Sequence, residues 1–196
     1  MKTPLICMTR WALASMSIVA GFQNQIIVGS SAAIAGQASS RSVPAKIFEP
    51  LLFEIKKKTH VPILLPSDLP HGVKDAKCAS GGADAGGYWV SLDYACPGGA
   101  NASFAAYFTG TLKSDYYIPQ GEDQRVRLAR GITGYFSPVS CGGSCAPANL
   151  FWQEKGVWYH LQLKDVGGPP ANEQEEQKQE KTIAAVANSA ILAGPR

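Results

Sequence analysis

The stretch of residues 131–164 constrains the fold most strongly, because it combines two strand patterns, a short polar turn and a closely spaced cysteine pair. Residues 150–153 and 157–164 are aromatic and aliphatic runs, separated by Glu154-Lys155-Gly156. A glycine in so short a connection can take the positive φ of a hairpin turn. The stretch therefore predicts a β-hairpin, and we expect it at the centre of the fold.

The second strand of this hairpin alternates between two kinds of residue, as a half-buried strand does. One face should meet the core, and it carries Val157, Tyr159, Leu161 and Leu163. The other face carries Trp158, His160 and Gln162. With Tyr135 and Trp89 from other strands, these three form an aromatic and polar patch, a surface that often marks recognition. In the alternative interpretation, a helix covers this face and the five residues belong to the core.

The cysteines indicate an oxidising compartment. Of five cysteines, Cys7 lies in the leader described below, and an even set of four remains. In an exported chain four cysteines indicate two disulfides, with three possible pairings. We favour Cys141 with Cys145, because the glycines between them let the backbone fold back, and Cys78 with Cys96, which would staple the two legs of one hairpin.

The first 35 residues have the composition of an export signal. Lys2 and Arg10 are their only charges, residues 11–22 are apolar, and Ala33-Ile34-Ala35 fits a cleavage site. We therefore predict a signal peptide over 1–35, a flexible mature N-terminus over 36–43 and a single domain over 44–196, periplasmic or secreted, without a stable membrane span after cleavage. A retained membrane anchor is the alternative. The formal net charge of +3 would fall to +1 on cleavage, which argues against nucleic acid as a partner.

The remaining chain predicts an α+β fold. Residues 47–58 show helical spacing, with Pro50 requiring that the helix kinks or begins just before it. Three prolines keep residues 61–70 extended, as an edge strand or a packed arm. We expect strands over 74–80, 88–94, 104–112 and 126–128, a glycine-rich turn over 81–87 and an exposed loop over 114–123. A long helix begins at Asn172, which pairs with Glu175 as in a capping box. The expected architecture is a twisted antiparallel sheet covered by an N-terminal and a long C-terminal helix.

No motif for catalysis, metal or cofactor is present. The C-x3-C spacing of Cys141 and Cys145 is not that of a thioredoxin-like site, and no G-x-S-x-G elbow occurs. The histidines are scattered without metal-ligand spacing. We therefore predict a non-enzymatic module that binds a protein or glycan of the envelope. The alternatives are a thiol-redox or hydrolytic envelope enzyme, or an inhibitor of a lysozyme-type hydrolase.

Several motifs carry a resemblance: THVPILLPSDLP at 59–70, GYFSP at 134–138, CGGSC at 141–145, the hairpin at 152–159 and ANSAI at 187–191. Together they resemble a family of uncharacterised exported bacterial proteins, over residues 44–196. The hairpin with the terminal helix is similar to a domain of unknown function attached to bacterial envelope and sporulation proteins. The small disulfide-bearing β-domain also resembles bacterial secreted inhibitors of lysozyme-type hydrolases. These resemblances imply an exported fold and supply no catalytic residue or ligand.

Overall fold

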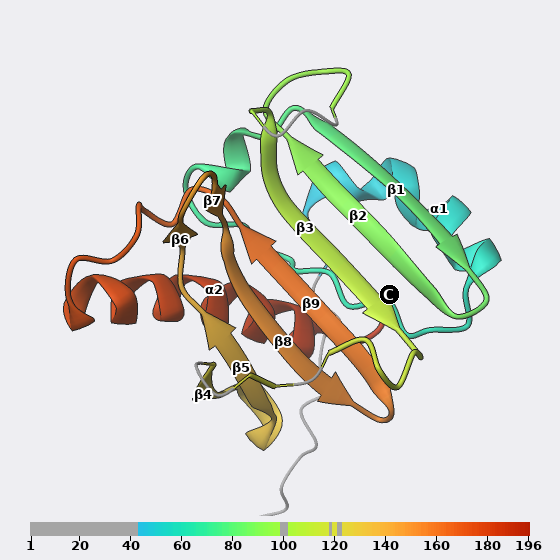
Figure 1. Ribbon diagram of the computed structural model, residues 1–196. Helices are drawn as coiled ribbons and strands as arrows, with labels where there is room; N and C mark the ends of the chain where they lie inside the picture. Colours follow the sequence, from blue (N-terminus) through green and yellow to red (C-terminus); the bar gives the residue numbers. More distant parts are fainter. Residues whose placement is uncertain (1–42, 99–101, 118, 121–122) are drawn as a thin grey trace, which may run out of the picture. The chain divides into compact units, whose positions relative to one another are not determined.

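The computed structural model describes residues 43–98, 102–117, 119–120 and 123–196. The predicted signal peptide, and all of the predicted flexible N-terminus except Val43, lie outside the described residues. The fold is α+β, as predicted: a seven-stranded antiparallel sheet in the order β1-β2-β3-β9-β8-β5-β4, with a short N-terminal helix and a long C-terminal helix on one of its faces (Figure 1).

The described chain forms a main sheet, a small ribbon, two α-helices and short 3₁₀ turns. The main sheet consists of β1 (Cys78–Asp84), β2 (Gly87–Asp93), β3 (Phe104–Thr111), β4 (Gln124–Arg127), β5 (Thr133–Ser137), β8 (Ala148–Glu154) and β9 (Val157–Leu163). A separate two-stranded ribbon consists of β6 (Ser140–Cys141) and β7 (Cys145–Ala146). The helices are α1 (Glu49–Lys58) and α2 (Glu173–Ala193), with 3₁₀ turns η1 (Lys46–Phe48), η2 (Val73–Asp75) and η3 (Ala129–Gly131).

The predicted hairpin lies at the centre of the sheet. Strand β9 is the fourth of seven and pairs with β8 in a register that sets Leu161 opposite Leu150. Lys155 and Gly156 both take positive φ in the turn, which confirms the role given to the glycine. The predicted apolar residues of β9 are all buried, so this strand supplies the middle of the core.

Residues 61–70 form the packed arm that the prolines predicted, and they cross the core face of the sheet (Figure 1). The Tyr88 hydroxyl accepts from the Leu64 N–H at 2.9 Å and donates to the Leu64 carbonyl at 3.1 Å. The Tyr159 hydroxyl donates to the Pro62 carbonyl at 2.9 Å. Two tyrosines of the sheet therefore hold the backbone of an arm that has no ladder of its own.

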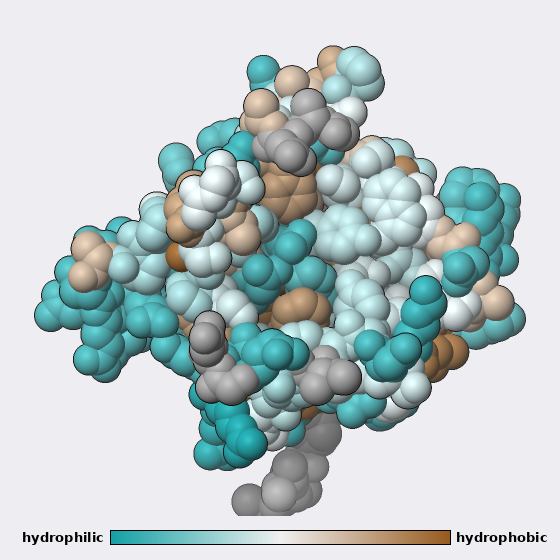
Figure 2. Space-filling model, in the orientation of Figure 1, coloured by the Kyte–Doolittle hydropathy of each residue, from teal (hydrophilic) through white to brown (hydrophobic). Residues whose placement is uncertain are grey.

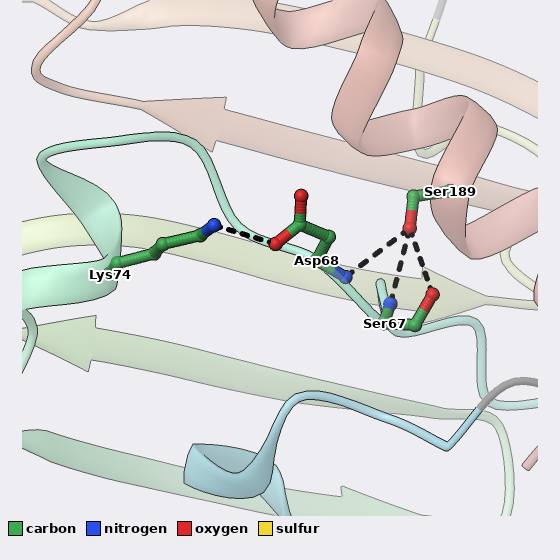
Figure 3. A network of polar contacts seen from close by, with 4 residues as sticks. All are labelled: Ser67, Asp68, Lys74 and Ser189. Atoms are coloured by element: carbon green, nitrogen blue, oxygen red, sulfur yellow. Dashed lines mark hydrogen bonds and ion pairs between the residues drawn. The ribbon is translucent and has the colours of Figure 1, made fainter.

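Helix α2 also holds this arm, through hydrogen bonds from the arm's backbone. The Ser189 hydroxyl accepts from the N–H groups of Ser67 and Asp68 at 3.2 and 3.4 Å, and Asp68 forms an ion pair with Lys74 at 2.8 Å (Figure 3). The start of α2 is capped as predicted, because the Asn172 side chain accepts from the Glu175 N–H at 3.0 Å.

The first half of α2 consists of polar residues, but one of its side chains is buried against the sheet side of the helix rather than exposed. The side chain of Gln179 is 2% exposed. Its oxygen accepts from the Val139 N–H at 3.0 Å, and its nitrogen donates to the Gly168 carbonyl at 2.6 Å. A polar residue is buried here because it satisfies the backbone of two loops at once.

Replacing Gln179 by alanine is therefore expected to lower the free energy of unfolding by about 2 kcal/mol, since it leaves buried backbone groups without partners. Urea denaturation measures the change. Gln177→Ala is the matched control, because Gln177 is exposed and its side chain donates to Glu173 on its own helix. Equal midpoints for the two variants would show that Gln179 does not tie the loops to α2.

The strand β1 begins later than predicted and runs through the glycines that were assigned to a turn. Gly81 and Gly82 pair with Val90 and Trp89 of β2, and the turn lies at residues 85–86. A Cβ atom on Gly81 would lie 2.9 Å from the Trp89 carbonyl oxygen and 3.3 Å from the terminal methyl of Ile55 in α1. The glycine is therefore required by close packing rather than by a turn.

Both predicted cysteine pairs are present. Cys78 and Cys96 form a pair with Cα atoms 5.7 Å apart, at the end of the β1–β2 hairpin. Cys141 and Cys145 form a pair with Cα atoms 4.1 Å apart, and they lie opposite each other in the β6–β7 ribbon. Within the described part of the chain, no helix is long and apolar enough to cross a membrane.

Candidate functional site

The two faces of the sheet differ in what covers them. The helices and the arm lie on the core face, and the view in Figure 1 looks onto the opposite face, which we call the open face. Strand register places one residue from each of five neighbouring strands in a single row across the open face. That row is Trp89, Thr109, His160, Phe151 and Tyr135.

One half of the open face is an aromatic stack. The rings of His160 and Phe151 lie parallel with centroids 3.9 Å apart, and Tyr117 stacks on the far side of Phe151 at the same separation. Trp158 contacts Tyr117 edge-on at 5.5 Å and lies 6.4 Å from Tyr135. These rings shield one another from water, so Trp158 and His160 are only 9% and 8% exposed.

The stack corrects two expectations. The segment 114–123 is not simply an exposed loop, because Tyr116 and Tyr117 pack against the open face. No helix in the described chain covers Trp158 and His160; the rings of Tyr117 and Phe151 do so instead. The sequence suggested either an exposed patch or a core covered by a helix. Neither interpretation included burial by aromatic side chains of the open face itself.

His160 is held by hydrogen bonds to both ring nitrogens. Asn149 fixes the tautomer: its amide nitrogen donates to the Pro147 carbonyl at 2.7 Å, so its oxygen faces Nε2 of His160 at 2.9 Å and accepts from it. The Nδ1 atom then accepts from the Tyr116 hydroxyl, 3.3 Å away. Burial lowers the pKa of His160 to about 3, so the ring is neutral at physiological pH. Gln162 donates to the same Asn149 oxygen at 2.7 Å.

Asp123 holds Tyr117 in place. Its carboxylate accepts hydrogen bonds from the hydroxyls of Tyr117 and Ser137 and from the N–H of Gln120. Burial acts to raise the pKa of Asp123, but these three donors outweigh it and hold the pKa below the usual value. The ionised carboxylate therefore fastens the segment that carries Tyr117 to strand β5.

The other half of the open face is a hollow around Trp89. The Trp89 side chain is 41% exposed. Its indole lies against Gly82 of β1, where an added Cβ atom would be 2.9 Å from Nε1. The Tyr107 ring is 6.5 Å away, with its plane only 17° from that of the indole. Because Gly82 leaves room for the indole, the indole and the neighbouring phenol together present aromatic surface on the open face. We call this pair the Trp89 platform.

This platform forms part of a hollow of about 890 Å³ between the β1–β2 hairpin, the end of β3 and Tyr116. Residues of intermediate hydropathy gather over β1, β2 and β3 on this face (Figure 2). The lining residues are Lys58, residues 82–89, Tyr107, residues 109–113 and Tyr116. The volume suits a small ligand or one unit of a longer one.

Hydroxyl groups line the hollow beside the platform. Thr109 interacts with the hydroxyls of both Tyr107 and Tyr116, while its own hydroxyl donates to the Tyr88 carbonyl. Burial is the main cause that raises the pKa of Tyr107, and that of Tyr116 to about 12. Both phenols therefore stay protonated at neutral pH; the Tyr116 proton is directed to His160, and its oxygen can still accept.

The five predicted binding residues all belong to the open face, but they divide between its two halves. Trp89 lies on the exposed platform, whereas Trp158, His160, Gln162 and Tyr135 lie in and beside the stack. Sequence reasoning missed the aromatic residues that connect these groups. They are Tyr107, Tyr116, Tyr117 and Phe151. The alternation of β3 offered a signal for the first of them, since Tyr107 falls on the face opposite Ala106 and Phe108.

In the part of the chain that the structure describes, no group of three or more His, Cys, Asp or Glu side chains is arranged to hold a metal ion. Comparison with protein-family models, with curated proteins and with solved structures finds no match to this chain. The resemblances drawn from the sequence motifs therefore gain no support, and the candidate site stands on its own geometry.

Proposed function

We propose that this protein is a non-enzymatic exported module that binds a glycan on the Trp89 platform. The observation that carries the proposal is the exposed indole, which lies against Gly82 beside a group of hydroxyls. A pyranose ring has an apolar C–H face and a polar periphery. An aromatic surface matches the C–H face, and hydroxyl groups match the polar periphery.

The lining of the hollow favours binding over cleavage. Glycoside hydrolysis usually requires two carboxyl groups, about 5–9.5 Å apart, that flank the scissile bond. Among the described residues that line the hollow, Asp84 is the only acidic one, and its Oδ1 already accepts from the Gly86 N–H at 2.8 Å. A sugar seated on Trp89 would therefore meet an adsorbing surface without the usual acid and base pair.

Two further features support an exported module. Four cysteines lie in two pairs at disulfide distance, as is common in oxidising compartments. The composition of the first 35 residues supplies the corresponding signal. Extracytoplasmic compartments are also where polymeric glycans of the cell envelope lie, so the proposed site and the proposed location agree.

Replacing Trp89 by alanine is expected to weaken glycan binding at least about tenfold, because the stacking surface is lost. The mature protein is tested by isothermal titration and affinity electrophoresis against a panel of chitin, cellulose, xylan, pectin and hyaluronan fragments and peptidoglycan sacculi. The matched control is Phe53→Ala, which removes an exposed aromatic ring from α1, outside the hollow. Far-ultraviolet circular dichroism shows whether both variants fold.

The proposal is wrong if the folded wild-type protein binds no member of the panel. It is also wrong if Trp89→Ala binds as tightly as the wild type. Weakening by Phe53→Ala but not by Trp89→Ala would move the site to the helical side of the molecule and contradict the assignment of the open face.

A further inference from the structure

We infer that the glycan bound on the Trp89 platform is acidic, with carboxylate groups on its sugar rings; this inference rests on the proposed function. The observation behind it is the distribution of charge around the hollow. The floor of the hollow, formed by Trp89 and Tyr107, is neutral. The rim at the β1–β2 turn carries Lys58, Lys113 and Asp84.

The two lysines reach the rim from separate elements. Lys58 is the last residue of α1, and Lys113 follows β3 by two positions. The hydrogen bond from the Leu112 N–H to the Gly86 carbonyl, 2.9 Å long, holds the backbone next to Lys113 against the β1–β2 turn. Both side chains are exposed, and within the described residues neither forms an ion pair.

The aspartate does not neutralise them. Asp84 directs Oδ1 to the Gly86 N–H, which fixes the turn, and it forms no ion pair with Lys58 or Lys113. The rim therefore has an excess of positive charge over a floor that has none. When a sugar ring lies on an open platform, a carboxylate attached to that ring stays partly in water. The lysine ammonium group is flexible and strongly hydrated, so it can pair with such a carboxylate.

The position of the charge also restricts the ligand. The lysines lie at the turn end of the hollow, whereas Tyr107 and Thr109 lie further along β3. A ligand must therefore present a ring face and an acidic group together. Sugars with a ring carboxylate, such as uronic acids, combine both features in a single residue.

Two pairs of probes, each matched in chain length, test the inference. The first is oligogalacturonate with its methyl ester, and the second is a hyaluronan oligosaccharide with its carboxyl-reduced form. We expect the acid of at least one pair to bind about three- to tenfold more tightly than its neutral partner at low ionic strength, as two exposed ion pairs would allow. Raising the salt concentration to about 0.5 M should remove most of this preference.

The double variant Lys58→Gln/Lys113→Gln should bind the acid no more tightly than the neutral form, and should bind the neutral form as the wild type does. The matched control is Lys56→Gln/Lys178→Gln, which removes the same charge from exposed helix positions outside the hollow and should keep the preference. Because all four lysines are exposed, both double variants are expected to fold.

Failure of the inference is distinguishable from failure of the proposed function. Suppose that Trp89→Ala abolishes binding, but acid and neutral forms bind equally in both pairs, or only neutral glycans bind. The platform is then a glycan site, and the acidic preference is wrong. A preference that survives Lys58→Gln/Lys113→Gln also overturns the inference. If no glycan binds to the folded protein, both proposals are overturned together.

Discussion

Replacing Gly110 by alanine is expected to lower the free energy of unfolding by about 3 kcal/mol, at the upper end of the usual cost of overpacking. Gly110 lies in β3, on the core face of the sheet, between Tyr88 of β2 and Tyr159 of β9. An added Cβ atom would lie 2.6 Å from Cε1 of Tyr88 and 2.9 Å from Cε1 of Tyr159. A single methyl group therefore clashes with two rings at once.

Neither ring can move aside without a second loss. The hydroxyls of Tyr88 and Tyr159 hold the backbone of the 61–70 arm at Leu64 and Pro62. Both phenols are shielded from water, and burial is the main cause that raises the pKa of each. Displacing them would leave backbone groups of the arm without partners, which costs more than the contact itself.

Urea unfolding of Gly110→Ala, followed by circular dichroism, measures this effect. Gly142→Ala is the control, because no atom beyond its two chain neighbours lies within 4 Å of the position that its Cβ would take. A change below about 1 kcal/mol in Gly110→Ala would mean that the arm gives way easily and is not fixed by the two tyrosines.

The periodic elements could be predicted from the sequence because their signals are local. The strand at β9, with its four apolar residues in the core, and the cap at Asn172 both depend on residues a few positions apart, and both were confirmed. The helix α1 begins just before Pro50, one of the two outcomes that the proline allowed. Such patterns follow from backbone geometry, which does not depend on the rest of the chain.

Strand β1 could not be placed because its residues argue against a strand when taken alone. Gly81 and Gly82 have low strand propensity and normally indicate a turn. These positions require glycine because the side chain of Ile55 packs against Gly81 and the indole of Trp89 packs against Gly82. A tertiary contact overrode the local preference.

The candidate site was predicted only in part, because it too depends on tertiary contacts. Alternation along β9 and β2 placed His160, Trp158 and Trp89 on one face correctly. Nothing local indicated that Tyr116 and Tyr117, in a polar and proline-containing segment, would return across that face. Their contacts join residues more than 30 positions apart in the sequence, so burial of the stack could be recognised only from the fold.

The stability of the protein is expected to fall as the pH falls from about 6.5 towards 3, and His160 should account for much of this loss. The folded state lowers the pKa of His160 from 6.5 to about 3, because burial disfavours the charged ring. Between these two values the unfolded chain binds a proton that the folded chain does not bind. The free energy of unfolding therefore decreases by about 1.4 kcal/mol for each pH unit in that range.

The surroundings of the ring offer no compensation for a charge. Its neighbours are Tyr107, Tyr116, Phe151 and Asn149, and in the described chain no carboxylate forms an ion pair with it. A proton on Nδ1 would also face the Tyr116 hydroxyl, which must then accept instead of donate. Asp123 adds a similar loss only at lower pH, since its pKa lies below the usual 3.8 of a carboxyl group.

Urea unfolding at pH 7.0 and 5.0 separates the contribution of His160 from those of the carboxylates. His160→Phe keeps a ring to stack on Phe151 but cannot bind a proton, so the loss of stability between these two pH values should shrink by about 2 kcal/mol relative to the wild type. His71→Gln is the control for removal of an imidazole, because His71 is exposed and lies outside the stack. Nitrogen-15 spectra of the imidazole should show a neutral ring protonated on Nε2 down to pH 5. A resonance that titrates near pH 6.5, or an equal pH dependence in His160→Phe and wild type, would mean that water reaches the ring and that the aromatic stack does not seal this half of the open face.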